Sequence, residues 1–316
     1  MNLETRLLQL DFAIQMELWQ EAYKAIEDIH GLMNLAKKMP RPQQMAQYYQ
    51  KLALVFGKSG NHLFHAAALF RLFQLSRDLK KNITADELQK LGSRVLVATL
   101  AVPLPSAHPE FDRFIETEKS ALEKTQKLAT LLHLNQPPTR NGLIKDLVRL
   151  GVVSTAMPQL QQLYQYLEVD FDPLYLCGKV KSILTSMGDV EETSYLNQYI
   201  PALEEITLTR LVKQVAQIYS SIQFDRLVQL ALFATAFELE RIVVNAVRHT
   251  DMQIRIDHRS NCLHFGSELF EAQREDLPEG PTLQVLNNGR LISPFLSTLR
   301  LFFYLRLCHP SRLGRT

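Results

Sequence analysis

The chain has 316 residues, of which 46% are hydrophobic and only 12 are glycine, so it can form about two globular units of ordinary size. Its 35 basic and 33 acidic residues give a net charge of +2, which excludes a polybasic nucleic-acid binder and an acidic disordered chain. The three cysteines are far apart in sequence, which excludes a disulfide framework and a cysteine zinc cluster. The N-terminal residues do not resemble a signal peptide, and no long uncharged apolar run precedes residue 290. We therefore expect a cytoplasmic protein without membrane contact.

Helical periodicity dominates the first half of the chain. Apolar residues from Ile14 to Ile29 recur at steps of three and four, which predicts one helix ending near Gly31. Two further runs in residues 45–81 are interrupted at residues 57–60, which predicts a helical hairpin whose glycines take the left-handed conformation. The next helix should open at Thr84, whose side chain can form a reciprocal capping box with Glu87.

Four more helices are predicted before residue 188, the second of them capped by Thr139. They cover residues 118–132, 143–150, 159–167 and 174–187. Small residues lie where neighbouring helices need close approach, which indicates stacked helix-turn-helix repeats. We predict a mainly α fold whose residues 1–205 form a right-handed helical-repeat solenoid of the TPR type.

The pattern changes near residue 206. A regular apolar stripe over residues 208–222 is followed by a short helix at residues 226–232. A third helix should open at Thr235, with Glu238 completing a capping box. Residues 252–257 and 262–265 then alternate between apolar and polar, which predicts a β-hairpin. Three helices followed by a hairpin are typical of a winged helix, which we place at residues 206–284.

The composition changes again at the C-terminal end. After Glu279 there is no acidic residue and no lysine, whereas five arginines remain. These are Arg290, Arg300, Arg306, Arg312 and Arg315. We expect residues 285–316 to form a divergent basic tail outside the fold.

Motifs that would indicate an enzyme or a metal site are incomplete. A sequence like the end of a phosphate-binding loop occurs at residues 56–59, but it follows a helix and has Leu52 where the first glycine belongs. His62 and His65 are three residues apart without further metal ligands nearby, so we interpret them as surface or half-buried histidines. Asp257 and His258 could act as an acid–base pair, but a hairpin tip offers no pocket. We expect no catalytic residue, metal, cofactor or small-molecule substrate.

Two binding interpretations concern the predicted winged helix. Its third helix carries an exposed stripe of Glu238, Arg241, Asn245 and Arg248, which in a helix-turn-helix protein would face a nucleic-acid groove. Across residues 237–264, however, four arginines are balanced by four acids, which disfavours DNA binding because phosphate contacts need excess positive charge. Contact with RNA stays open for four arginines, Arg241, Arg248, Arg255 and Arg259.

Protein contact is the favoured use of the hairpin, because a two-stranded wing leaves backbone amides and carbonyls unpaired at its edges. A strand from a partner can satisfy them, with main-chain hydrogen bonds giving affinity. The residues we assign to these strand edges are Met252, Ile254, Arg255, Ile256, Leu263 and Phe265. The apolar members also cover the winged-helix core on one face of the hairpin.

Three colinear segments resemble the family of the largest subunit, the A subunit, of eukaryotic translation initiation factor 3. They are LWQEAYKAIEDIHGL at residues 18–32, PPTRNGLIKDLVRLGVV at residues 137–153, and SIQFDRLVQLALF with FELERIVVNAVRHTDMQIRIDH over residues 221–258. The similarity covers about residues 3–284. A helical array ending in a winged helix is the PCI domain, which scaffold subunits of the proteasome lid, the signalosome and this initiation factor share.

The resemblance implies a non-catalytic scaffold that assembles through its wing with other subunits of initiation factor 3, the C subunit first and the B subunit as a second candidate. It also implies a role in recruiting mRNA and the small ribosomal subunit. Chains of this family are far longer, so we expect the present chain to be a fragment. Two alternatives stay open: a winged-helix nucleic-acid-binding protein, and a PCI scaffold of the proteasome lid or signalosome.

Overall fold

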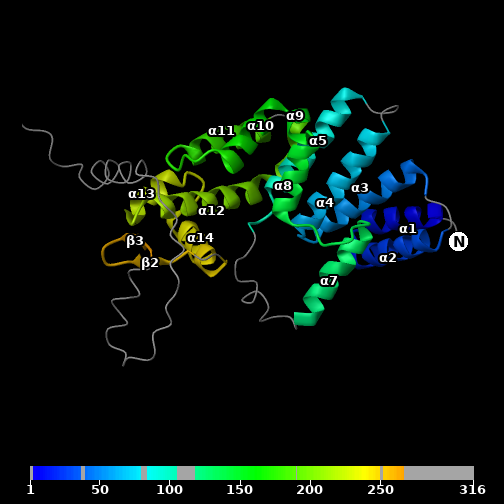
Figure 1. Cartoon of the computed structure of the whole chain (residues 1–316), viewed down its shortest axis with the longest axis horizontal. Helices are drawn as coiled ribbons and strands as arrows, with labels where there is room; N and C mark the ends of the chain where they lie inside the picture. The colour runs from blue at the N-terminus through cyan, green and yellow to red at the C-terminus, as the bar shows by residue number, and fades with distance from the viewer. Residues whose placement is uncertain are drawn as a thin grey trace, which may run out of the picture. The chain divides into compact units, whose positions relative to one another are not determined.

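The structure is a computed structural model of the whole chain, and it describes residues 3–36, 40–79, 84–104, 118–189, 191–249 and 252–266. Within these residues the fold is mainly helical, with one small antiparallel sheet near the C-terminal end (Figure 1). The chain divides into two compact units, unit 1 (Met1–Leu208) and unit 2 (Thr209–Thr316). The predicted fold class, a helical-repeat array followed by a winged-helix-like region, is confirmed.

Unit 1 begins with helices that pack on their neighbours along the chain. They are α1 (Leu3–Gln15), α2 (Trp19–Leu35), α3 (Pro42–Lys58), α4 (His62–Asp78) and α5 (Ala85–Leu100). Helix α1 packs on α2, α3 on α4, and α4 on α5, as Figure 1 shows from blue to cyan. Contacts between sequence neighbours of this kind are typical of a helical repeat.

The prediction of a single helix from Ile14 to Ile29 is wrong. The chain leaves the helical conformation at residues 16–18, where Glu17 has a φ of 56°, and α2 then runs through Gly31 to Leu35. The apolar period continued across the break because both helices bury their inner face. One glycine inside a helix costs only about 1 kcal/mol, so Gly31 does not end α2.

The turn between α3 and α4 uses its two glycines differently. Gly60 has a φ of +74°, as predicted for a left-handed residue at the end of a helix. The same prediction is wrong for Gly57, which lies inside α3. A Cβ atom at Gly57 would lie 2.9 Å from Nδ1 of His65, so this glycine permits a close approach of α3 and α4.

The remaining elements of unit 1 vary in length and type. They are α7 (Glu118–Leu131), α8 (Arg140–Arg149), α9 (Val152–Thr155), α10 (Pro158–Tyr164), the π-helix η2 (Gln165–Val169), α11 (Leu176–Asp189) and the 3₁₀-helix η3 (Glu191–Tyr199). The predicted caps are confirmed, because the Thr84 hydroxyl accepts from the Glu87 amide at 3.2 Å and the Thr139 hydroxyl from the Gly142 amide at 3.1 Å. No helix was predicted at α9 or η3, and α10 and the start of η2 were predicted as one helix over residues 159–167.

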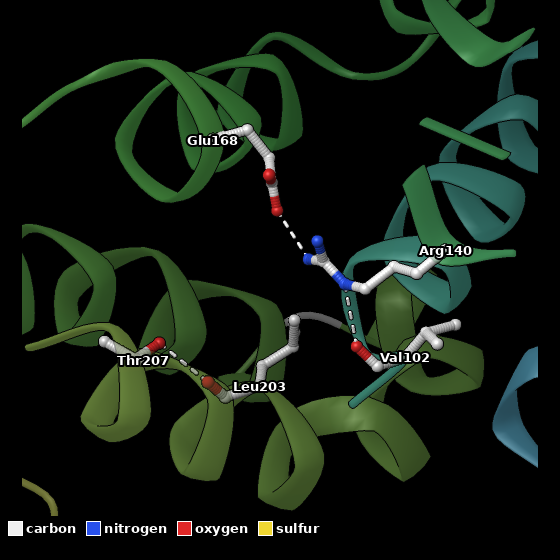
Figure 2. Close-up of polar contacts among 5 residues, drawn as sticks. All are labelled: Val102, Arg140, Glu168, Leu203 and Thr207. Atoms are coloured by element: carbon white, nitrogen blue, oxygen red, sulfur yellow. Dashed lines mark hydrogen bonds and ion pairs between the residues drawn. The ribbon is translucent and has the colours of Figure 1, made fainter. Parts of the chain in front are cut away.

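A buried arginine joins three parts of unit 1 (Figure 2). Arg140, at the start of α8, is 4% exposed, and its Nε donates to the carbonyl of Val102 after α5 at 2.9 Å. Its Nη2 lies 2.5 Å from the Glu168 carboxylate in η2. The guanidinium therefore links α8, the end of α5 and the π-helix.

Helix α12 (Ile200–Ile218) begins in unit 1 and ends in unit 2. In the unit 1 part of this helix the buried Thr207 hydroxyl donates to the Leu203 carbonyl at 2.6 Å (Figure 2). Past the division, Leu211, Val212 and Val215 are completely buried. Further along are β1 (Ser221–Gln223), α13 (Phe224–Leu230), α14 (Ala236–His249), β2 (Ile254–Asp257) and β3 (Cys262–Phe265).

The predicted β-hairpin is confirmed, because β2 and β3 pair antiparallel. The sheet of unit 2 has a third strand that was not predicted, and its strand order is β1-β3-β2. Strand β1 is only three residues long and lies directly before α13, so it has no alternating pattern of its own. The capping box at the start of α14 is confirmed, since the Glu238 amide donates to the Thr235 hydroxyl at 3.4 Å and the Thr235 amide to the Glu238 carboxylate at 2.9 Å.

The division at residues 1–205, 206–284 and 285–316 stays a prediction. The basic tail and residues 267–284 lie outside the described residues.

Candidate interaction surface

Strand β3 occupies the middle of the sheet, so both of its edges are paired. In the register, Leu263 lies opposite Ile222 of β1 and also opposite Ile256 of β2. Phe265 donates its amide to the Ser220 carbonyl on the β1 side at 2.8 Å. Because backbone groups alternate sides along a strand, Leu263 and Phe265 bond to β1, while Cys262 and His264 bond to β2.

Strand β2 lies at the edge of the sheet, with a strand on one side only within the described residues. The amide of Gly266 donates to the carbonyl of Gln253 at 3.1 Å, which fixes the direction of the backbone groups along β2. Gln253, Arg255 and Asp257 therefore face β3. The amides and carbonyls of Ile254 and Ile256 point to the open side.

The assignment of six residues to strand edges is thus corrected for three of them. Leu263 and Phe265 are not at an edge, because β1 and β2 enclose β3. Met252 precedes β2, which begins at Ile254. Binding of a partner at any of the six residues stays a prediction. This includes a role in binding for Ile254, Arg255 and Ile256, which lie on the open strand.

One face of the sheet covers the core of unit 2. Leu263 is fully buried and Phe265 is 8% exposed, and their cross-strand partners Ile256 and Ile254 are half-buried. The expectation that these residues cover the winged-helix core is confirmed. Burial of this face leaves the backbone of β2 unpaired on its outer side within the described residues, because a strand's hydrogen-bonding direction is perpendicular to its side-chain direction.

The turn between β2 and β3 is held by Asp257. Its carboxylate accepts from the Arg259 amide at 2.9 Å and from the Ser260 hydroxyl at 2.8 Å. These bonds hold the pKa of Asp257 below its usual value, and the bond from Ser260 has the largest effect. Asn261 completes the turn in the left-handed conformation, with a φ of 52°. The turn thus fixes the register of the open strand.

The wing also contacts α14. Nε2 of His258 lies 3.5 Å from the Glu240 carboxylate, and both groups line a cavity of about 20 Å³ at the turn between β2 and β3. A cavity of this volume holds a single water molecule. Asp257 and His258 therefore do not line a substrate-sized pocket.

The four arginines assigned to RNA contact belong to three elements. Arg241 and Arg248 lie in α14, Arg255 in β2 and Arg259 in the following turn. The side chains of Arg241, Arg255 and Arg259 are exposed. Their contact with RNA stays a prediction.

The stripe predicted on α14 was incomplete. Phe237 is 77% exposed and Val244 is 52% exposed, and neither was assigned a role. They are seven residues apart on the face opposite the buried Leu239 and Val243, a spacing that was visible in the sequence. The helix was predicted from its buried apolar stripe alone, so the exposed apolar residues on the opposite face were overlooked.

In unit 1, the interpretation of His65 as a surface or half-buried residue is wrong. His65 is 3% exposed, and its Nδ1 lies 2.6 Å from the Ala53 carbonyl and its Nε2 2.7 Å from the Tyr199 hydroxyl. Burial lowers its pKa to about 4. The part of the chain that the structure describes contains no group of three or more histidine, cysteine or acidic side chains arranged to hold a metal.

Among the described helices, none is both long enough and apolar enough to span a lipid bilayer.

Two protein-family models match the chain. The model described as "eIF3a, PCI domain, TPR-like region" covers residues 1–175, and the model described as "PCI domain" covers residues 184–267. The first match covers unit 1 from α1 to η2, and the second begins within α11 and includes the three-stranded sheet.

Curated relatives match over nearly the whole chain. The A subunit of eukaryotic translation initiation factor 3 from Aedes aegypti is 62% identical over 297 residues, which is 94% of this chain and 26% of the relative. The proteins of the same name from Drosophila willistoni and Drosophila melanogaster are each 58% identical over 93% of this chain and 26% of their own length. The matched length exceeds the interval 3–284, so the similarity extends past the predicted limit. The chain spans about a quarter of the length of these relatives, and it belongs to the A-subunit family of eukaryotic translation initiation factor 3, a family of PCI-domain proteins.

Proposed function

We propose that this chain acts as a non-catalytic scaffold in cytoplasmic initiation factor 3, and that strand β2 pairs with a strand from another of the factor's subunits. The observation that supports this is the open edge of β2, where Ile254 and Ile256 present their amides and carbonyls away from the sheet. Such an edge is a template for one further strand. The turn held by Asp257 keeps this edge in one register before a partner binds.

The proposed partner is the C subunit of the factor, whose wing would add the next strand, with the B subunit as a second candidate. Membership of the family supports this choice, because PCI wings assemble with one another. A supporting role in recruiting mRNA and the small ribosomal subunit follows from the same assembly.

Proline substitutions in β2 test this proposal, because they can remove an amide that points to the open side or one that faces β3. In Ile254→Pro the lost amide belongs to the open edge, where proline is tolerated. The three-stranded sheet should survive, while the affinity for the C subunit should fall about tenfold, since a hydrogen bond is lost and the ring obstructs the added strand. Binding of the full-length protein to the immobilised C subunit measures the change, and circular dichroism reports the fold.

Two control variants define the reference. Ile254→Val keeps the amide and should bind like the wild type. Arg255→Pro removes a donor that faces β3 and should destabilise the wing itself. If Ile254→Pro is folded and binds the C subunit with unchanged affinity, strand addition at β2 is wrong.

RNA contact is a second candidate, because Arg241, Arg255 and Arg259 are exposed on unit 2. Replacing these three arginines with glutamine should weaken binding to single-stranded RNA and reduce its dependence on salt concentration. An unchanged salt dependence would contradict RNA contact at these residues. Binding of labelled duplex DNA at physiological salt without binding to the C subunit would favour the nucleic-acid-binding alternative. Recovery of proteasome-lid or signalosome proteins in place of initiation factors in a pull-down would favour the alternative of a PCI scaffold in those assemblies.

A further inference from the structure

The outer face of α14 is formed by Phe237, Arg241 and Val244. Phe237 and Val244 are 77% and 52% exposed, and two helical turns place them about 10 Å apart along the axis. Arg241 is exposed between them. The opposite face of the helix, with Leu239, Val243 and Ala246, is buried in unit 2. The outer face therefore presents apolar, cationic and apolar groups in a row.

The acidic side chains of α14 are engaged elsewhere. The carboxylate of Glu238 accepts from the Thr235 amide at 2.9 Å and from the Thr235 hydroxyl at 3.0 Å. These two bonds lower the pKa of Glu238, and the charge of Arg241 contributes as a weaker cause. Glu240 lies beside His258 of the wing, at 3.5 Å. Within the part of the chain that the structure describes, Arg241 forms no ion pair or hydrogen bond, so its guanidinium can bind a carboxylate of another molecule.

We propose that the outer face of α14 docks an amphipathic α-helix of a protein partner, with a carboxylate opposite Arg241 and an apolar side chain on each side of it. A partner helix meets Phe237 and Val244 with residues of the same seven-residue spacing. Arginine forms directed, bidentate bonds with a carboxylate, and arginine and aromatic side chains are common binding hot spots. Among the side chains of this face that the structure describes, Arg241 is the exposed cation, and it favours an acidic partner.

A nucleic acid fits the face less well. Helix α14 contains two acids and two arginines, Glu238, Glu240, Arg241 and Arg248, so it has no excess positive charge for phosphates. Phe237 could stack on a base, but the aliphatic Val244 has no ring for stacking. Two apolar anchors around one cation match a helix surface better than a phosphate backbone.

The outer face differs from the open edge of β2, so this inference does not rest on the proposed function. Strand addition uses backbone groups of Ile254 and Ile256, whereas the outer face uses side chains of α14. Phe237→Ala should therefore leave binding to the C subunit through β2 intact, and Ile254→Pro should leave the outer face intact.

The experiment places a photoreactive phenylalanine analogue at Phe237 of the full-length protein within the assembled complex. Irradiation should give a cross-link to a protein segment with acidic and apolar residues at helical spacing, identified by peptide mass spectrometry. The same analogue at Leu35, which is 83% exposed in α2, provides the control and should not give this product. Cross-linking to RNA, to a segment without acidic residues, or to no molecule would overturn the proposal.

Variants of the same complex test the chemistry of the contact. With the analogue at Phe237, Arg241→Glu should reduce the yield of the cross-link at least tenfold, and changing the identified carboxylate to lysine should restore it. Val244→Ala should reduce the yield several-fold. These side chains are exposed, so circular dichroism should be unchanged. A yield that is insensitive to Arg241→Glu, or a loss that the partner's lysine does not restore, would also overturn the proposal.

Discussion

A buried hydrogen-bond network in unit 1 joins His65, Tyr199 and Arg94. His65 of α4 uses both ring nitrogens, because Nδ1 donates to the Ala53 carbonyl and Nε2 accepts from the Tyr199 hydroxyl. The Nε of Arg94 is 3.5 Å from the same hydroxyl. A buried imidazole with both nitrogens bonded in this way must stay neutral, which agrees with its lowered pKa.

The protonation of His65 makes stability depend on pH. Its pKa is about 4 in the folded chain and 6.5 in the unfolded chain, so the unfolded state takes up a proton first as the pH falls. Stability is therefore fully present above pH 6.5 and is lost between pH 6.5 and 4. We expect His65 to lower the free energy of unfolding by about 2 kcal/mol between pH 7 and pH 5.

Urea denaturation at the two pH values measures this change. His30 and His133, whose pKa values burial also lowers, act in the same direction. His65→Gln should therefore remove most of the decrease and leave a smaller one. An equal decrease in the wild type and in His65→Gln would show that the assignment to His65 is wrong.

Two glycines in helices are expected to respond oppositely to alanine. In Gly57→Ala the new methyl group would meet the His65 ring at 2.9 Å, so we expect a loss of about 1–3 kcal/mol of stability. In Gly31→Ala nothing lies within 4 Å of the new methyl group, so we expect a gain of about 0.5–1 kcal/mol. Thermal unfolding of both variants decides the matter, and a stabilising Gly57→Ala would rule out the close approach.

At the scale of elements, the ion pair between Arg140 and Glu168 links helix α8 to the π-helix η2. Its partners are 3% and 12% exposed at the side chain, so neither charge is well hydrated. Such a pair contributes little relative to apolar residues of similar size, but it is costly to break because one charge remains buried.

Removing one member of this pair should therefore be strongly destabilising. For Arg140→Met we expect a loss of about 3–5 kcal/mol, measured by urea denaturation. The exposed pair of Arg149 with Asp146 provides the comparison, and Arg149→Met should cost less than about 0.5 kcal/mol. Similar losses for the two variants would show that the buried position of Arg140 has no special role.

Elements with strong local signals were predictable from the sequence. Thr84, Thr139 and Thr235 were identified as caps because the capping interaction involves residues only three apart. The break at Glu17 and the strand β1 were missed because neither has a local signal. Ile222 becomes part of a strand only because Leu263 lies opposite it.

At the scale of the whole molecule, helix α12 belongs to both units. Its buried residues Leu203 and Ile206 belong to unit 1, and its buried residues Leu211 and Val215 belong to unit 2. A cut between residues 208 and 209 would therefore divide a continuous helix and remove its first turns.

This arrangement predicts how unit 2 behaves in isolation. A fragment of residues 200–284 keeps all of α12 and should unfold cooperatively in urea. A fragment of residues 209–284 loses about half of the helix and should be less stable, because short helices are marginal without their full length. Equal stability of the two fragments would show that the first half of α12 does not support unit 2.

The sequence alone determined the fold class, most helices, the caps and the family, because periodicity, capping and segment similarity are written in residues close together along the chain. The tertiary structure alone decided which strand lies at the edge of the described sheet. Leu263 and Ile254 both alternate with polar neighbours and were assigned the same role, yet one lies on the enclosed strand and the other on the open one. Strand order depends on pairing between residues about 40 positions apart, which no local pattern encodes. The burial of His65 was decided in the same way, by Tyr199 arriving from 134 residues further along the chain.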